Sequence, residues 1–202
     1  MDIHHFSIRK GDLGVRPLIP SDAVYLTRWL NDPTVLEYYE GRDKPQSPEL
    51  VRQRFLTKSG EPVLACLVSW RHAPVGYAQI YPLDEEAAQA YQEPSEGAWG
   101  MDLFLGETHL WGCGIGTELV SALSEALFHH MGACRILIDP RVNNPRAVHV
   151  YQKCGFCVKR RLIRHELHEG HLEDCWLMEK TAPTADAPSR NASHRNQGAD
   201  RG

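Results

Sequence analysis

The chain has 202 residues, 42% of them apolar and 24% charged, a composition typical of one soluble globular domain with its own core. Lysine plus arginine number 22 and aspartate plus glutamate 26, so the formal charge of -4 leaves no basic excess for a phosphate backbone and argues against a nucleic-acid partner. No apolar run has the length of a membrane span, and the amino terminus lacks the pattern of a secretory signal, which predicts a cytoplasmic protein with no membrane partner.

The spacing of the cysteines and histidines does not indicate a metal site. Only Cys154 and Cys157 form a CxxC pair, and no second pair accompanies it, so the six cysteines are expected to be free thiols. His165, His168 and His171 fall in a strand-turn-strand pattern and not at the helical spacing of paired ligands. We therefore expect no bound metal.

The first half of the chain alternates short helical and extended patterns. Gly, Pro, Asn and Asp punctuate these runs, and Ser stands where two helices begin. In chain order we expect a strand near 15–17, a helix from Ser21 stopped by Asn31-Asp32-Pro33, a helix from Ser47, strands over 62–70 and 75–81 joined by a hairpin at 71–74, an acidic polar insert over 84–96, and a strand over 98–105.

The second half predicts a helix and a strand, then a helix and two strands. In order these are a helix over 117–130, a strand over 135–138 ending at Asp139-Pro140, a helix begun by Asn144-Pro145 and ended by Gly155, and strands near 157–166 and 172–179 around a turn at Glu169-Gly170. The sum is an α+β fold, a mixed sheet flanked by helices. Residues 1–180 are expected to form one domain, and residues 181–202, which contain no large apolar side chain, a disordered tail.

A glycine-rich turn between a strand and a helix carries the first functional signal. In Trp111-Gly112-Cys113-Gly114-Ile115-Gly116-Thr117, alternate glycines allow a ligand to approach the backbone closely. The free N–H groups and the positive dipole end of the following helix suit a pyrophosphate. The segment is neither a Walker loop nor a GxGxxG fingerprint, and by itself it also fits an ordinary tight turn.

A second motif, over residues 144–156, indicates what the glycine turn binds. Residues 144–156, NPRAVHVYQKCGF, resemble the NxxAxxxYxKxGF signature of the GCN5-related N-acetyltransferases (GNAT). The resemblance implies a mostly antiparallel sheet that splays at an acetyl-coenzyme A site, with the glycine turn holding the pyrophosphate. Trp111 stands where the superfamily usually has Gln or Arg. The coenzyme-binding residues implied by the resemblance are Phe104, Leu105, Trp111, Gly112, Gly114, Ile115, Gly116, Thr117 and Asn144.

Scattered shorter matches resemble the aminoglycoside 6'-N-acetyltransferases of the same superfamily. They include residues 29–31, the aromatic pair Tyr38-Tyr39, residues 75–79, and Asp102 and Asp139 at the ends of two strands. The resemblance implies that both aspartates line the acceptor site and that one of them takes the proton of the amine. The residues expected to bind the cationic aminoglycoside are Trp29, Tyr38, Tyr39, Tyr77, Gln79, Asp102 and Asp139.

Physical chemistry is consistent with these roles. A polycation needs carboxylates as counter-charges and aromatic faces against its sugar rings, and we expect the acidic insert over 84–96 to help steer it inward. Acetyl transfer requires a neutral amine, which favours Asp102 as general base, directly or through a water. Tyr151, near the thioester sulfur by resemblance, is expected to protonate the leaving thiolate. Direct attack needs no covalent enzyme intermediate, so Cys113 is expected to be a packing or loop residue.

Plainer interpretations remain open for several of these residues. Asp139 before a proline fits a turn, Trp29 fits core packing, Tyr77 and Gln79 fit an ordinary sheet surface, and Tyr151 fits an aromatic at the core edge. Two other functions also remain. One is a siderophore-type acetyltransferase acting on N6-hydroxylysine, whose members tend to have His in place of Asp102. The other is a non-catalytic acyl-coenzyme A-binding module. The chain is expected to be a monomer or a homodimer.

Overall fold

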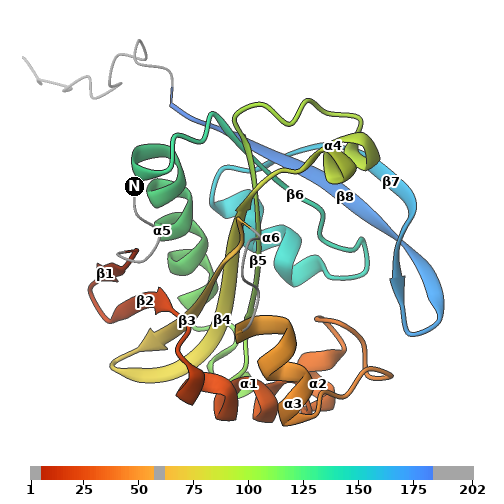
Figure 1. Ribbon diagram of the computed structural model, residues 1–202. Helices are drawn as coiled ribbons and strands as arrows, with labels where there is room; N and C mark the ends of the chain where they lie inside the picture. Colours follow the sequence, from red (N-terminus) through yellow and green to blue (C-terminus); the bar gives the residue numbers. More distant parts are fainter. Residues whose placement is uncertain (1–5, 57–61, 184–202) are drawn as a thin grey trace, which may run out of the picture.

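An eight-stranded sheet runs through the molecule and carries the helices on its two faces (Figure 1). The structure is a computed structural model that describes residues 6–56 and 62–183. The strand order is β1-β2-β3-β4-β5-β6-β8-β7. The strands are β1 (Ile8–Lys10), β2 (Leu13–Pro17), β3 (Leu64–Trp70), β4 (Ala73–Pro82), β5 (Ala98–Leu105), β6 (Arg135–Ile138), β7 (Cys157–His168) and β8 (His171–Thr181).

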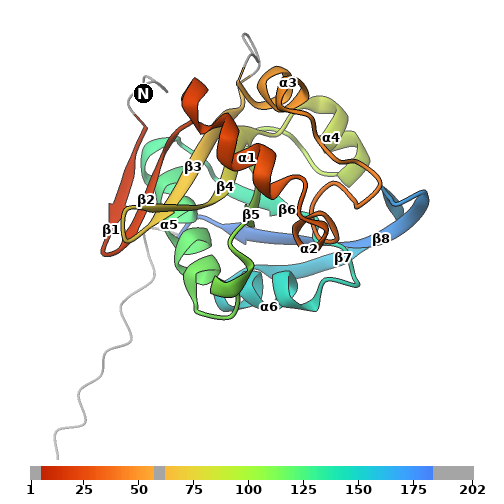
Figure 2. The same ribbon diagram turned by 90° about the horizontal axis from the view of Figure 1, so that it is seen from below.

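The helices form two layers, with α1 to α4 on one face of the sheet and α5 and α6 on the other (Figure 2). Side-chain caps begin four of them: Asp32, Ser47, Asp84 and Asn144 each accept a hydrogen bond from a backbone N–H in the first turn. The helices are α1 (Ala23–Trp29), α2 (Pro33–Leu36), α3 (Pro48–Val51), α4 (Glu85–Tyr91), α5 (Ile115–His130) and α6 (Pro145–Lys153).

The largest core lies between the sheet and α5. Leu119, Leu123 and Leu127 recur at four-residue spacing on one face of α5 and are fully buried against the strands. A second core under α1 to α3 gathers Trp29, Tyr77 and other buried apolar side chains on the opposite face. The sheet is therefore sandwiched between apolar layers, as the expected α+β class requires.

The sheet splays open along one edge of β5. On one side β5 pairs with β4 over Trp99–Leu105, but on the other it pairs with β6 only over Ala98–Gly100. β6 pairs with β8 over its whole length, Arg135–Ile138, and no strand within the described ranges pairs with this edge of β5 over Met101–Leu105. The β5–β6 pair is parallel, while the other pairs described are antiparallel. The expected mixed, mostly antiparallel sheet with a splay is thus confirmed.

The expected element boundaries agree closely with the observed ones in the centre of the sheet and less well around it. The strands over 98–105 and 135–138 are reproduced residue for residue. The acidic insert contains helix α4, which the prediction missed, and a short helix α2 begins at Pro33, where only a helix stop was expected. β8 continues to Thr181. The predicted tail lies largely outside the described residues, so it stays a prediction.

Candidate active site

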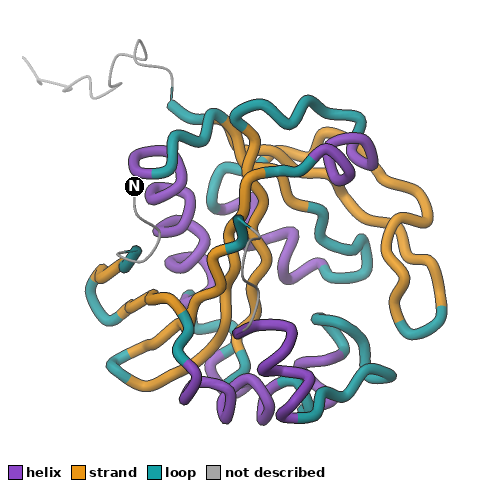
Figure 3. Tube along the Cα trace, viewed as in Figure 1, coloured by secondary structure: helices purple, strands orange, loops and turns teal. Residues whose placement is uncertain are grey.

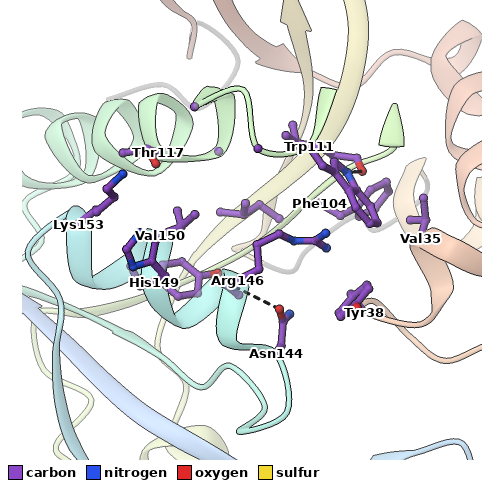
Figure 4. Close-up of a pocket in the computed structure, with 17 residues that line it drawn as sticks. Val35, Tyr38, Phe104, Trp111, Thr117, Asn144, Arg146, His149, Val150 and Lys153 are labelled. Carbon is purple, nitrogen blue, oxygen red and sulfur yellow. Dashed lines mark hydrogen bonds between the residues drawn. The ribbon is translucent and has the colours of Figure 1, made fainter. Parts of the chain in front are cut away.

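A cavity of about 370 Å³ lies between the open edge of β5, helix α6 and the glycine turn (Figure 4). A Cβ added at Gly112, Gly114 or Gly116 would meet no atom within 4 Å, so the backbone of the turn is open to a ligand. Gly112 and Gly114 have φ of 81° and 87°, a conformation that favours glycine. Gly114 caps the 16-residue helix α5, whose first N–H groups and dipole end therefore face this space.

The predicted coenzyme residues come together around this cavity with one exception. Phe104, Leu105, Trp111, the three glycines, Thr117 and Asn144 all line it. Ile115 follows the turn, but its side chain is 1% exposed and belongs to the core, so only its backbone is available to a ligand. Asn144 caps α6 by accepting a hydrogen bond from the Ala147 N–H at 3.2 Å, which orients its amide at the cavity wall.

Basic side chains of α6 also line the cavity, and the sequence analysis missed them. Arg146, His149 and Lys153 follow one another at helical spacing along the wall seen in Figure 4. The Arg146 guanidinium lies 3.8 Å from the centroid of the Trp111 ring and 4.6 Å from that of Tyr38. Desolvation lowers the pKa of Arg146 below its usual value. The contact with Trp111 thus holds the Arg146 cation of α6 beside the glycine turn. The superfamily usually has a Gln or Arg in place of Trp111 itself.

A second cavity, of about 400 Å³, adjoins the first. Leu103, Asn144 and Tyr151 line both cavities, so the two spaces meet at the splay of β5. Among its walls are the middle of β5, the end of β6, the segment after α2 and the end of β7. The predicted substrate residues that line it are Tyr38, Tyr39, Gln79, Asp102 and Asp139.

Asp102 lies in this second cavity, and its hydrogen-bond partners within the described part of the chain are neutral. Its Oδ2 accepts hydrogen bonds from Gln79 Nε2 at 2.6 Å and from the Tyr81 hydroxyl at 3.1 Å. The Tyr77 hydroxyl in turn donates to Gln79 Oε1 at 2.7 Å, which fixes the direction of the amide. Burial outweighs these hydrogen bonds and raises the pKa of Asp102 to about 6. Such a carboxylate is charged at neutral pH and is basic enough to accept a proton.

Asp139 follows β6 and lines the same cavity, as expected, whereas Asp102 lies within β5 and not at the end of a strand as predicted. The partner of Asp139 is a histidine: His165 Nε2 lies 3.0 Å from Asp139 Oδ2. This contact raises the pKa of His165. His165, one of the three histidines considered in the sequence, is therefore the partner of a carboxylate. The described residues contain no grouping of potential ligands able to hold a metal ion.

Tyr151 stands where the two cavities meet. Its ring is buried against Phe156, at 9% exposure, while its position in both linings brings it to the junction. Burial, together with the nearby charges of Asp102 and Asp139, raises the pKa of its phenol. The hydroxyl is therefore protonated across the physiological range and can act as a donor.

Two of the predicted substrate contacts are wrong. Trp29 is 1% exposed and packs against Phe104, and Tyr77 is fully buried between Phe55 and Phe104, so neither offers an open face. Both belong to the second core, and the alternative of ordinary packing holds for Trp29. Tyr77 reaches the site only through its hydroxyl on Gln79.

The acidic insert does not supply the charge of the site. Its residue Glu93 forms ion pairs with Arg135, Lys159 and Arg160, and no residue of the insert lines the second cavity. The additional carboxylates there are Glu40 and Glu166, which sequence reasoning missed. Tyr81 was missed as well, although it shares a strand face with Tyr77 and Gln79 at two-residue spacing.

The comparisons with known proteins agree with this geometry. A family model described as an acetyltransferase (GNAT) domain matches residues 19–163, which include the splayed strand, the glycine turn and α6. The chain belongs to the GNAT acetyltransferase family. It is an acetyl-coenzyme A-dependent N-acetyltransferase, and the open glycine turn, the free edge of β5 and the basic face of α6 fit the phosphates and the arm of that coenzyme.

Individual GNAT relatives carry names related to aminoglycosides. The chain is 29% identical over 171 residues to an aminoglycoside N(6')-acetyltransferase type 1 of Klebsiella pneumoniae, covering 77% of this chain and 85% of that protein. A kanamycin resistance protein of Rhizobium radiobacter is 40% identical over 65 residues, covering 32% of this chain and 60% of that protein. The structure of AAC(6')-Ib in complex with ribostamycin and coenzyme A superposes with a TM-score of 0.73 at 26% identity, covering 91% of this chain and 99% of the other.

Figure 3 shows the strands of this GNAT fold running through the centre of the molecule, with helices on both sides of them. Within the described ranges, no helix combines the length and the apolar character needed to cross a bilayer.

Proposed function

We propose that this GNAT enzyme is an aminoglycoside 6'-N-acetyltransferase, which acetylates a primary amine of the antibiotic in a ternary complex with acetyl-coenzyme A. The observation that carries the proposal is the pair of aspartates, Asp102 and Asp139, in a cavity that meets the coenzyme cavity at Tyr151. The cavity's other carboxylates have cationic partners, since Glu40 pairs with Arg54 and Glu166 lies 3.9 Å from Arg141. Asp102 is held by neutral donors, which leaves its charge for an ammonium group.

The proposed reaction uses these residues in sequence. Acetyl-coenzyme A supplies the acetyl group as a thioester. Asp102 takes the proton of the substrate ammonium, and its pKa of about 6 keeps it charged at neutral pH. Backbone N–H groups on the open edge of β5 donate to the carbonyl oxygen during attack. Tyr151 then donates its phenolic proton to the departing thiolate, and the second proton that the nitrogen loses as the amide forms passes through solvent to restore the phenol.

Aromatic faces of the second cavity suit a sugar acceptor. Tyr38 and Tyr39 lie shortly after α2 and line the same cavity as the aspartates, and both are part-buried. Aromatic rings of this kind cover the apolar face of a sugar ring and attract its ammonium groups. The relatives named above support an aminoglycoside as the acceptor, because one is an aminoglycoside N(6')-acetyltransferase and another has been solved with ribostamycin and coenzyme A.

One observation favours the second candidate, an acetyltransferase of N6-hydroxylysine. Arg141 lines the same cavity with a side chain that is 4% exposed, and its Nη1 has no hydrogen-bond partner within the described part of the chain. Lys44 lines the cavity as well. Two cations suit an acceptor with a carboxylate, which an amino acid has and an aminoglycoside lacks.

A thiol-release assay separates the two candidates. Acetyl-coenzyme A is supplied with kanamycin, tobramycin, gentamicin or N6-hydroxylysine, and the acetylated position is assigned by NMR of the product. We expect rapid turnover of kanamycin and tobramycin with the acetyl group on the 6'-nitrogen. Turnover of hydroxylysine alone would reverse the ranking, and coenzyme binding without turnover of any amine would favour the non-catalytic module.

A further inference from the structure

The two aspartates of the acceptor cavity have different partners. Asp102 accepts hydrogen bonds from an amide and a phenol, neither of which titrates near neutral pH. Asp139 instead faces His165, a residue that gains or loses a charge between pH 5 and 8. The coupling of a titrating side chain to one acceptor carboxylate, and not to the other, is a property of this particular cavity.

The geometry of the Asp139–His165 pair defines which proton can change. Asp139 Oδ2 lies 3.0 Å from Nε2, and a carboxylate there requires a proton on Nε2. The second ring nitrogen, Nδ1, is therefore the one that titrates, and the hydrogen bond to Asp139 persists in both forms. Only the charge of the ring changes: a protonated His165 neutralises Asp139, whereas a neutral His165 leaves its negative charge available.

The other groups around His165 determine how it titrates. Tyr91 of α4 places its ring 5.7 Å from the imidazole, and burial together with the charge of Asp139 raises the pKa of its phenol, so Tyr91 stays neutral. Glu166, next on β7, and Asp139 both favour the protonated ring, and partial burial opposes it. The net result raises the pKa of His165, so it gains its proton at a higher pH than an isolated histidine.

Resting on the proposed function, we infer that His165 is a positioning residue that competes with the substrate's ammonium group for Asp139. In its protonated form the imidazolium holds the carboxylate's charge, and binding of a cationic acceptor at Asp139 releases the Nδ1 proton to solvent. Affinity for the acceptor therefore falls as the pH drops and His165 becomes charged. The chemical step, which depends on Asp102, is not affected by this competition.

Kinetics of a non-titrating variant test the inference. In His165→Gln the amide can still donate to Asp139 but cannot gain a charge. We measure KM and kcat for kanamycin between pH 5.5 and 8.5 and take the ratio of wild type to variant at each pH, which cancels the titration of the substrate's own amines. The KM ratio should rise at least about fivefold towards low pH, the lower end of typical coupling between linked sites, while the kcat ratio stays constant.

The control is His171→Gln, an exposed histidine on the same hairpin, whose ratios should not change with pH. A KM ratio for His165→Gln that is flat with pH would overturn the inference even if kanamycin is a good substrate. Absence of kanamycin turnover by the wild type would instead refute the proposed function, and the inference with it.

A second readout does not depend on turnover. NMR titration of labelled histidine gives the pKa of His165 directly, and linkage requires that kanamycin lower it, because the acceptor binds the neutral form better. Asp139→Asn should also lower this pKa by removing the facing carboxylate. A His165 pKa that is unmoved by saturating kanamycin would contradict the competition.

Discussion

Replacing Asp102 by asparagine should stabilise the protein at neutral pH while removing its general base. Burial raises the pKa of Asp102 from 3.8 to about 6 in the folded chain, a difference of about 2 units. One unit corresponds to about 1.4 kcal/mol, so the charged carboxylate costs the folded state up to about 3 kcal/mol. Asparagine has the same shape, carries no charge and can accept hydrogen bonds from Gln79 and Tyr81 through Oδ1.

The pH dependence of this gain has a definite sign. Because the folded pKa lies above the unfolded one, the folded wild type binds a proton more tightly, and its stability falls as the pH rises from about 4 to about 6. The cost is complete above this window and absent below it. The advantage of Asp102→Asn should therefore be about 3 kcal/mol at most at pH 8 and close to zero at pH 4.

Urea unfolding at a series of pH values measures the difference in the free energy of unfolding. Asp139→Asn is the matched control, because that carboxylate faces the titratable His165 and its removal breaks a favourable contact. We expect Asp139→Asn to be no more stable than the wild type at pH 8. An Asp102→Asn protein less stable than the wild type at pH 8, or a difference that does not change with pH, would refute the account of Asp102 as a carboxylate destabilised by burial.

Three further predictions concern the coenzyme cavity and the proton transfers. Gly114→Ala should weaken coenzyme binding, measured by calorimetry, and lower the free energy of unfolding by about 1 kcal/mol, because φ is 87° at this position. Gly132→Ala is the control: Gly132 also has a positive φ but lies away from the cavity, so this variant should lose stability and keep its coenzyme affinity. Tyr81→Phe removes one hydrogen-bond donor to the Asp102 carboxylate and should therefore raise the pKa of Asp102. In the pH profile of kcat, the fall on the acid side should move from about pH 6 upward by about one unit. An unshifted profile would exclude Asp102 as the titrating group. Tyr151→Phe should lower kcat by about 10²-fold with little change in coenzyme affinity, and an unaltered kcat would count against its role as the acid.

The residues that hold the coenzyme could be predicted because their signals are local. Glycines in a turn, an Asn-Pro helix start and a continuous apolar strand each determine the backbone within a few residues. The structure therefore reproduces the strands over 98–105 and 135–138 and the start of α6 at Asn144-Pro145, while α5 begins at Ile115, two residues before its expected start. The opening between β5 and β6 was predicted from the resemblance to the family.

The acceptor cavity was harder to predict because its walls come from distant parts of the chain. Trp29 and Tyr77 have the residue type of a sugar contact, but packing under α1 and α3 buries them. His165 meets Asp139 across 26 positions of sequence, through a hairpin whose length gives no sign of where its side chains will lie. Helix α4 was a different case: its Asp84 cap and alanines were present in the sequence, but the acidic composition was interpreted as a loop.

The most direct test asks whether Asp102 removes the proton of the substrate amine. It compares steady-state thiol release with kanamycin between the wild type and Asp102→Asn, at pH 7.5 and saturating acetyl-coenzyme A. The account predicts rapid acetylation by the wild type, a loss of at least about 10²-fold in kcat for the variant, and equal coenzyme affinity in both. Near-normal turnover of kanamycin by Asp102→Asn would show that the proton is removed elsewhere and would contradict the account.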